Sequence, residues 1–241
     1  MHQGYRIGAV LLMGGSGARF GDPIPKQFCL LAGKPLYRYA LETFLNFGVF
    51  DEILLVCHPA WLGKVEASPL FRLVSGGQTR QESSRAGLQA FSSAPEIVLI
   101  HDAVRPFVSE DIIRANVDAA IAWGAADTCI PTADTLVHAP IWEWIDSIPK
   151  REEFLRGQTP QTFRYPVIAE AHEKAVQKGI SNCSDDCRLV LDLGGKIAVV
   201  PGSEENLKIT SPFDLRVAEA LLAVKKEKEN TNSYFSLCTA K

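Results

Sequence analysis

The sequence VLLMGGSGARFGDPIPKQ, residues 10–27, carries a glycine-rich loop directly after an apolar run. Four glycines fall close together: Gly14, Gly15, Gly17 and Gly21. An apolar run without polar alternation is typical of a strand buried on both faces of a parallel sheet. Glycines after such a strand let backbone N–H groups approach phosphate oxygens closely. The stretch therefore predicts an α/β fold with a phosphate-binding loop behind its first strand.

Two familiar phosphate loops fit this stretch poorly. A nucleoside-triphosphatase loop needs a lysine directly after its last glycine, whereas Asp22 follows Gly21. The dinucleotide fingerprint needs a glycine where Phe20 stands. Its ribose-binding acid would be Glu42, which falls inside a predicted helix. An NAD(P)-binding oxidoreductase is therefore kept only as a distant alternative.

Two basic residues distinguish the loop from both templates. Arg19 lies among the glycines, and Lys26 follows the sequence DPIP. The two prolines restrict the chain, so less entropy is lost when the Lys26 ammonium group is placed. Cations beside a glycine loop neutralise the charge of a bound phosphate. We therefore predict that this loop binds phosphate.

The rest of the chain alternates between apolar runs and segments with helical periodicity. The predicted strands are residues 7–13, 53–57, 72–74, 97–100, 127–130 and 196–200. Helices are predicted at residues 35–47 and 110–123, from Pro166 to a stop at Gly179, and after the SPFD sequence at 211–214. This order predicts a Rossmann-like α/β domain, a mostly parallel twisted sheet flanked by helices. Ligands of such sheets bind at the carboxyl ends of the strands.

Composition limits the classes of partner. The chain has 25 basic and 28 acidic residues, a net charge of −3, which argues against binding to nucleic acid or to an anionic membrane. No segment approaches the ~20 apolar residues of a membrane span, and the first residues lack the apolar core of a signal peptide. The six cysteines include no C-x-x-C pair, as expected of reduced thiols. We expect a cytoplasmic protein.

Two segments break the regular alternation. Residues 135–156 contain two prolines and no clean period, and they carry the large apolar side chains Trp142, Trp144 and Ile145. We predict an extended β-arm there that contacts a partner chain, because exposed apolar groups commonly mark interfaces. Residues 225–241 are charged and then polar, which predicts a flexible C-terminal tail. Residues 1–224 are expected to form a single domain.

Several motifs together identify a family. The pattern G-G-x-G-x-R-x-G-x-x-x-P-K-Q at residues 14–27 resembles the signature of sugar-nucleotide pyrophosphorylases and cytidylyltransferases. The other matching motifs are GGQTRQESSRAGL at 76–88, HDAVRPFV at 101–108, ADTL at 133–136, QTPQTF at 158–163 and ENLKITSPFDL at 205–215. Across residues 7–215 the chain resembles the 2-C-methyl-D-erythritol 4-phosphate cytidylyltransferase family. Ribitol-5-phosphate cytidylyltransferases are close relatives that share most of these motifs.

The resemblance implies transfer of CMP from CTP to a sugar or polyol phosphate, with release of pyrophosphate. The implied acceptor is 2-C-methyl-D-erythritol 4-phosphate, for isoprenoid biosynthesis; the alternative is ribitol 5-phosphate, for cell-wall polymers. The implied catalytic residues are Arg19, Lys26 and Lys208, which would cradle the triphosphate and stabilise charge at the α-phosphorus. The residues implied to bind the nucleotide are Gly14, Gly15, Ser16, Gly17, Gly77, Gln78, Ser83, Asp102 and Ala103. A non-catalytic nucleotide-binding regulator would be expected to lack such lysines.

One carboxylate is a candidate magnesium ligand. Asp102 follows the apolar strand at residues 97–100 and so lies at its carboxyl end. Magnesium prefers one or two carboxylates together with phosphate oxygens. We therefore expect Mg²⁺ as the cofactor, held by Asp102.

The acceptor side of the site is also implied by the resemblance. The matching positions are Thr135, Arg151, Thr159 and Ser184. In the family, the arginine comes from the arm of the partner subunit, which implies a homodimer with composite active sites. Two departures concern the acceptor. Ala133 stands where a basic residue is common, and residues 145–161 resemble in parts the ribitol-phosphate relatives.

Overall fold

A mixed, mostly parallel sheet forms the centre of the molecule. The computed structural model describes residues 2–14 and 25–239, with side chains to residue 227 in the last helix. The strands of the main sheet are β1 (Ile7–Met13), β4 (Glu52–Cys57), β5 (Arg72–Ser75), β6 (Ile97–Asp102), β7 (Ala125–Pro131), β8 (Leu155–Arg164) and β9 (Ala198–Pro201). Their order is β5-β4-β1-β6-β8-β7-β9, and β8 runs antiparallel to both of its neighbours. A short hairpin pairs β2 (Leu30–Leu31) with β3 (Lys34–Pro35).

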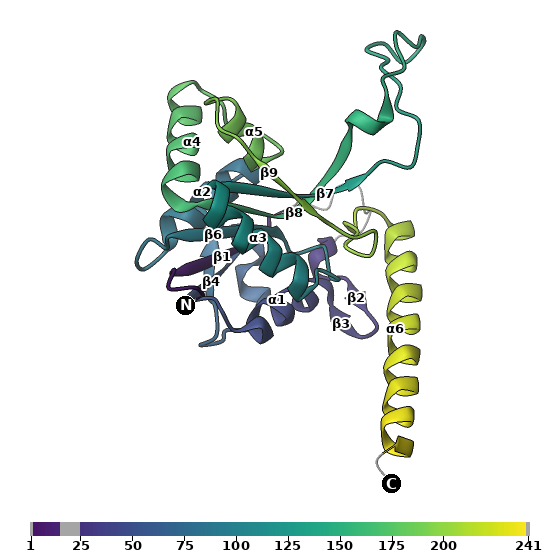
Figure 1. Ribbon diagram of the computed structural model, residues 1–241. Coiled ribbons are helices and arrows are strands. Elements are labelled where there is room, and N and C mark those ends of the chain that lie inside the picture. The colour runs from purple at the N-terminus through teal and green to yellow at the C-terminus, as the bar shows by residue number, and fades with distance from the viewer. Residues whose placement is uncertain (1, 15–24, 240–241) are drawn as a thin grey trace.

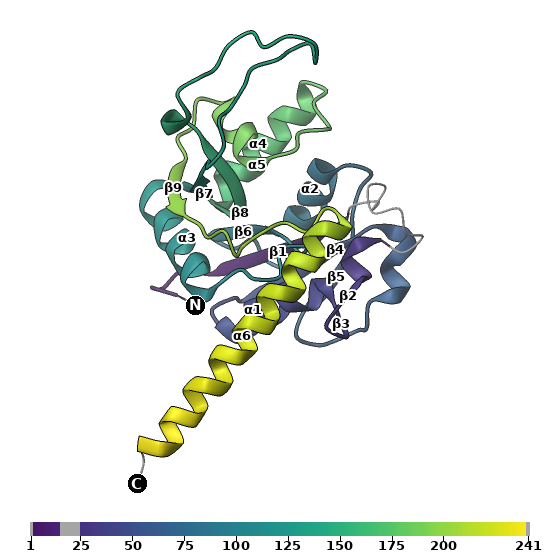
Figure 2. The same cartoon turned by 90° about the vertical axis from the view of Figure 1, so that its right-hand side faces the viewer.

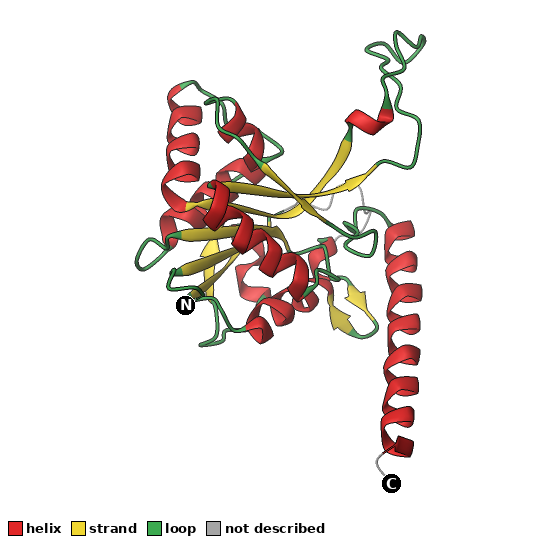
Figure 3. Ribbon diagram, viewed as in Figure 1, coloured by secondary structure: helices red, strands yellow, loops and turns green. Residues whose placement is uncertain are grey.

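Helices cover both faces of this sheet (Figures 1 and 3). The helices are α1 (Leu36–Phe47), α2 (Arg80–Ala90), α3 (Glu110–Trp123), α4 (Tyr165–Gln177), α5 (Asp186–Leu191) and α6 (Pro212–Thr239), with short 3-10 turns at Lys26–Phe28, Pro59–Lys64 and Arg151–Glu153. In β1, Leu11 faces the core under α1 and α3, whereas Val10 and Leu12 face the core under α2, α4 and α5. Because both faces are buried, β1 is apolar throughout. The predicted α/β fold is confirmed.

Strand β8 was not predicted, and its sequence explains why. It reads LRGQTPQTFR, which has little apolar character and contains Pro160. Its four central polar side chains, Gln158, Thr159, Gln161 and Thr162, are nevertheless buried, and each has a hydrogen-bond partner. Gln158 donates to the Ser203 carbonyl at 2.8 Å, and Gln161 donates to Asp185 at 2.7 Å. The central position of β8 therefore depends on polar contacts that periodicity does not reveal.

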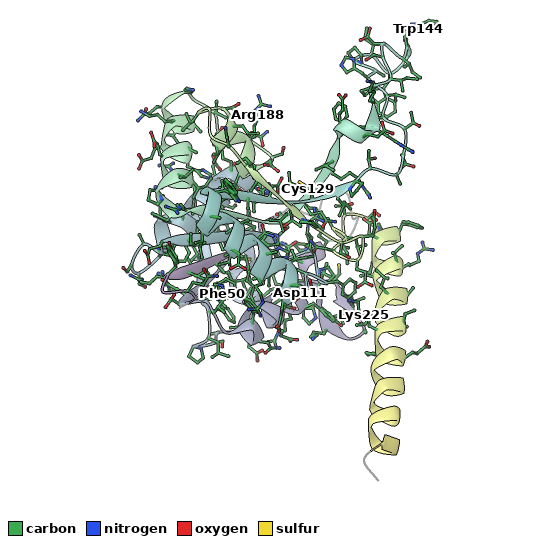
Figure 4. All side chains as sticks on the ribbon, viewed as in Figure 1. Phe50, Asp111, Cys129, Trp144, Arg188 and Lys225 are labelled. Carbon is green, nitrogen blue, oxygen red and sulfur yellow. The ribbon has the colours of Figure 1, made fainter. Side chains whose placement is uncertain are left out.

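The predicted arm joins β7 to β8 and extends away from the sheet (Figure 1). Figure 4 places Trp144 at its far end. Within the described residues the arm contains no strand before β8, only one isolated bridge between His138 and Ser147 and the turn at Arg151–Glu153. Its exposed apolar side chains include Ile141, Trp142, Trp144, Ile145 and Ile148. The arm is thus mostly a long loop rather than the expected β-arm.

The C-terminal segment is helical where we expected a tail. Helix α6 continues past Lys225 to Thr239 and projects away from the body (Figure 2). Lys225 forms an ion pair with Glu205 at 2.7 Å and lies over the ring of Phe107. These contacts hold the helix at the point where the polar composition begins. Flexibility beyond it stays a prediction. Across the described residues, no helix has both the length and the apolarity to span a membrane.

Candidate active site

A cavity of about 700 Å³ lies at the carboxyl ends of the parallel strands. Gly14 follows β1, His58 follows β4, and Asp102 ends β6, so three neighbouring strands open into it. This is the position at which open α/β sheets bind ligands. The predicted site residues that line the cavity are Gly14, Lys26, Gln78, Ser83, Asp102, Ser184 and Lys208. The sequence motifs, far apart in the chain, thus meet at one place.

Asp102 is the charged centre of the cavity. Its carboxylate is held by Lys208, whose Nζ lies 2.6 Å from Oδ2, and by Arg80, whose Nε lies 3.4 Å from Oδ1. Burial alone would raise the pKa of Asp102, but Arg80, Lys208 and Arg105 together hold it well below its usual value. The group is therefore an anion at neutral pH, as a magnesium ligand must be.

Arg80 was missed by the sequence analysis, and so was the helix that carries it. Thr79 and Glu82 form a capping box at the start of α2, so the T-x-x-E spacing could have predicted this helix. Gly87 allows α2 to lie close to the sheet, because a Cβ there would approach Val10 Cγ1 to 2.5 Å. The first turn of α2 therefore faces the cavity, with Arg80 on its wall.

The loop before α2 is held in shape by hydrogen bonds to the first turn of that helix. The Gly77 N–H donates to Ser83 Oγ at 3.2 Å, and the Gln78 N–H donates to a Glu82 carboxylate oxygen at 2.7 Å. Ser83 Oγ in turn donates to the Thr79 carbonyl at 2.9 Å. A Cβ on Gly77 would lie 2.3 Å from Glu82 Cβ, so only glycine fits this turn. The loop is a preformed edge of the cavity, on which the Gln78 side chain is exposed and Ser83, although 1% exposed, lines the wall.

A family profile described as 2-C-methyl-D-erythritol 4-phosphate cytidylyltransferase matches residues 7–224. The chain belongs to this family. It is 36% identical over 229 residues to a ribitol-5-phosphate cytidylyltransferase of Lactiplantibacillus plantarum, a match that covers 90% of this chain and 98% of that protein. It is therefore a cytidylyltransferase that uses CTP.

Solved structures agree with this membership. The 4-diphosphocytidyl-2C-methyl-D-erythritol synthase of Anaerococcus prevotii superposes with a TM-score of 0.77 at 29% identity, covering 91% of this chain and 99% of that one. The 2-C-methyl-D-erythritol 4-phosphate cytidylyltransferase of Thermus thermophilus gives 0.74 at 34% identity, with the same coverage.

For this cytidylyltransferase, part of the predicted loop lies outside the described residues. Gly15, Ser16, Gly17 and Arg19 belong to this part. Lys26, at the start of the 3-10 turn, lies on the cavity wall. Gly77 is not among the residues that line the cavity, and neither is Ala103, which is fully buried and donates its N–H to the Leu12 carbonyl at 2.9 Å. Contacts with the nucleotide stay predictions for all of these residues.

The predicted acceptor residues are not brought together within one chain. Thr135 and Arg151 are exposed on the arm, where Arg151 donates to the Ala133 carbonyl at 3.1 Å. Thr159 is 4% exposed, and its hydroxyl accepts the Asp102 N–H at 3.1 Å and donates to His101 Nδ1 at 3.0 Å. In the described structure this hydroxyl thus holds the Asp102 backbone in place.

The donor set fits a magnesium ion that is bound jointly with a nucleotide. Asp102 is the sole carboxylate among the described residues that line the cavity. Those residues form no group of three carboxylate, imidazole or thiol side chains that could hold a metal by themselves. A lone carboxylate suits Mg²⁺, which takes its remaining ligands from phosphate oxygens and water.

Proposed function

We propose that the protein is a ribitol-5-phosphate cytidylyltransferase, which transfers CMP from CTP to ribitol 5-phosphate and releases pyrophosphate. The observation that carries this proposal is the 36% identity to the Lactiplantibacillus plantarum protein of that name, over 98% of its length. Two sequence features agree: Ala133 replaces a basic residue, and residues 145–161 resemble the ribitol-phosphate relatives.

The reaction needs charge neutralisation more than covalent catalysis. An oxygen of the acceptor phosphate attacks the α-phosphorus of CTP, the bond from that phosphorus to the bridging oxygen breaks, and pyrophosphate leaves. Lys26 and Lys208 reach the same cavity from different parts of the chain. In our proposal their ammonium groups stabilise the charge that builds on the α-phosphate, together with Arg19 from the glycine loop. Fixed charges of this kind need no reorganisation during the reaction.

Magnesium dependence is part of the proposal. Asp102 would hold the ion, which would neutralise phosphate charge and so favour departure of pyrophosphate. Lys208 and Arg80 keep this carboxylate ionised and oriented before any ligand arrives. We propose that Lys208 exchanges its contact with Asp102 for one with the α-phosphate when the nucleotide binds.

We also propose a homodimer in which each arm completes the partner's site. Arg151 does not line the cavity of its own chain. Trp142 is 99% exposed and Trp144 is 76% exposed, which is unusual for such large apolar side chains. Burial of this arm against a second copy would remove that surface from water and bring Thr135 and Arg151 to the partner's acceptor site. The scattered reduced cysteines favour a cytoplasmic location.

A second candidate acceptor is 2-C-methyl-D-erythritol 4-phosphate. It is favoured by the family profile over residues 7–224 and by the 34% identity to the Thermus thermophilus enzyme. With this acceptor, the protein would act in isoprenoid biosynthesis.

Parallel kinetics separates the two acceptors. The purified protein is given CTP and Mg²⁺ with ribitol 5-phosphate or with 2-C-methyl-D-erythritol 4-phosphate, and pyrophosphate release is measured. We expect kcat/KM to favour ribitol 5-phosphate by at least about 10-fold, the discrimination available to one or two polar contacts. The opposite preference would assign the second candidate. Omitting Mg²⁺ should abolish turnover with either acceptor.

A further inference from the structure

Arg80 connects the candidate active site to a buried polar cluster. Its guanidinium spans two carboxylates: Nη1 lies 2.6 Å from Asp186 Oδ2, and Nε lies 3.4 Å from Asp102 Oδ1. Asp102 lines the cavity, whereas Asp186 is 1% exposed at the start of α5. A guanidinium can contact two carboxylates at once because its donors form a rigid planar fork.

Asp186 is a firm anchor for this guanidinium. Ser84, one helical turn after Arg80 on α2, donates to Asp186 Oδ1 at 2.8 Å, and His172 Nε2 lies 2.9 Å from the same oxygen. The Asp186 N–H donates to Gln161 Oε1 at 3.1 Å. Both carboxylate oxygens thus have partners: Oδ2 is held from α2, and Oδ1 from α2 and α4. Asp186 fixes the position of Arg80, because loss of this ion pair would leave the buried Asp186 carboxylate without its cation and strongly destabilise the fold.

We propose that Arg80 is a positioning residue, which holds the Asp102 carboxylate in the orientation that the reaction requires. This inference rests on the proposed function and deepens it. Lys208 holds the other oxygen of Asp102, but its side chain is 37% exposed, and a lysine ammonium sits on a stem with several rotatable bonds. Arg80 is 21% exposed and fixed at both ends. When Lys208 turns to the nucleotide, Arg80 keeps Asp102 in place.

A lysine could not replace Arg80 fully. Its single ammonium would have to choose between Asp102 and Asp186, since it lacks the planar fork. Arg80→Lys should therefore retain the positive charge but lose the bridge. Arg80→Gln should lose both. The three forms of residue 80 separate the contribution of the charge from that of the geometry.

The test is a double-mutant cycle with Asp102. Arg80→Gln is expected to lower kcat by about 10- to 100-fold, the usual effect of removing a partner of a ligating group. It should also weaken binding of Mg²⁺ and CTP about 10-fold by isothermal titration calorimetry, and Arg80→Lys should fall between it and the parent. In an Asp102→Asn background, Arg80→Gln should change neither quantity by more than about 2-fold, because a residue that acts through Asp102 is then silent.

Controls keep the outcomes distinct. Arg85 lies on the same helix but lines a different pocket. The Arg85→Gln variant should therefore have the kcat and the affinity for Mg²⁺ and CTP of the parent. Circular dichroism melts establish that each variant is folded; if Arg80→Gln does not fold, Arg80→Lys takes its place in the cycle. Equal losses with and without Asp102 would overturn the positioning role, as would parental kcat and affinity in Arg80→Gln. If the parent turns over no acceptor, the proposed function fails, whereas the calorimetric cycle still tests Arg80.

Discussion

Replacing Lys208 with alanine is the most direct perturbation of the proposed chemistry. Its Nζ lies 2.6 Å from Asp102 Oδ2, so the ammonium already reaches the part of the cavity where a phosphate would meet Asp102. Alanine removes this charge but leaves Arg80 to hold the carboxylate. The variant should therefore fold and bind nucleotide, yet lose stabilisation of the charge at the α-phosphorus.

The size of this effect follows from the position of the side chain. Two unit charges about 4 Å apart interact by about 4 kcal/mol at an effective dielectric constant of about 20. Lys208 is 37% exposed, so solvent screens part of this interaction. A remaining contribution of roughly 3 kcal/mol corresponds to about a 100-fold fall in kcat. This is comparable to the loss of one preorganised donor in other enzymes.

Steady-state pyrophosphate release measures this loss. Lys208→Arg keeps the charge and should recover part of the activity, and Lys196→Ala, an exposed lysine before β9, serves as the matched control. A Lys208→Ala variant with kcat within about 3-fold of the parent would refute a role in charge stabilisation, since it corresponds to less than 1 kcal/mol.

Three further perturbations test other parts of the molecule. Arg151→Ala should raise KM for the acceptor by about 10-fold or more, the cost of losing a charged hydrogen bond, with KM for CTP unchanged. A Trp142→Ala/Trp144→Ala double variant should sediment as a monomer in analytical ultracentrifugation, because large aromatic side chains dominate interfaces. Burial and the neighbouring Asp185 raise the pKa of Asp127 to about 6. The folded protein therefore retains a proton that the unfolded chain has lost, and stability falls as the pH rises from about 4 to 6. Asp127→Asn should be more stable than the parent by about 1–2 kcal/mol at pH 7.5, with a smaller difference at pH 5.

A specific result would contradict each of these three expectations. Unchanged acceptor kinetics in Arg151→Ala would remove the arm from the acceptor site. A double tryptophan variant that dimerises as tightly as the parent would place the dimer contact elsewhere. If thermal melts show the Asp127→Asn advantage to be the same at pH 5 and 7.5, the Asp127 carboxylate does not titrate in that range.

Periodicity and turn residues located many of the elements. Strand β1 has the bounds expected from the apolar run at 7–13, and helix α3 has the expected bounds 110–123, with Ser109 as its N-terminal cap. Strand β8 was not predicted, because its buried side chains are polar and their hydrogen-bond partners lie elsewhere in the chain. Helix α2 was not predicted either, because it lacks an apolar stripe, although its capping box is visible in the sequence.

The sequence identified those cavity residues that belong to a local pattern or to a family motif. Asp102 at the end of β6 follows from local sequence, and Lys26 and Lys208 follow from the family motifs. Thr159 was assigned to the acceptor from its motif, yet its hydroxyl is buried against His101. A motif identifies a position, whereas the direction of a side chain depends on the packing around it.

The sequence by itself determined the α/β class, the glycine loop after the first strand and membership of a cytidylyltransferase family. These features follow from local periodicity and from motifs in a fixed order. Only the tertiary structure decided that Arg80 bridges Asp102 and Asp186, a contact with a residue 106 positions away, and that the arm projects from the body. Such contacts are set by how helices and strands pack, which no local pattern encodes. The sequence of residues 10–27 indicates nucleotide binding, whereas packing brings the charged groups of Arg80 and Lys208 to Asp102.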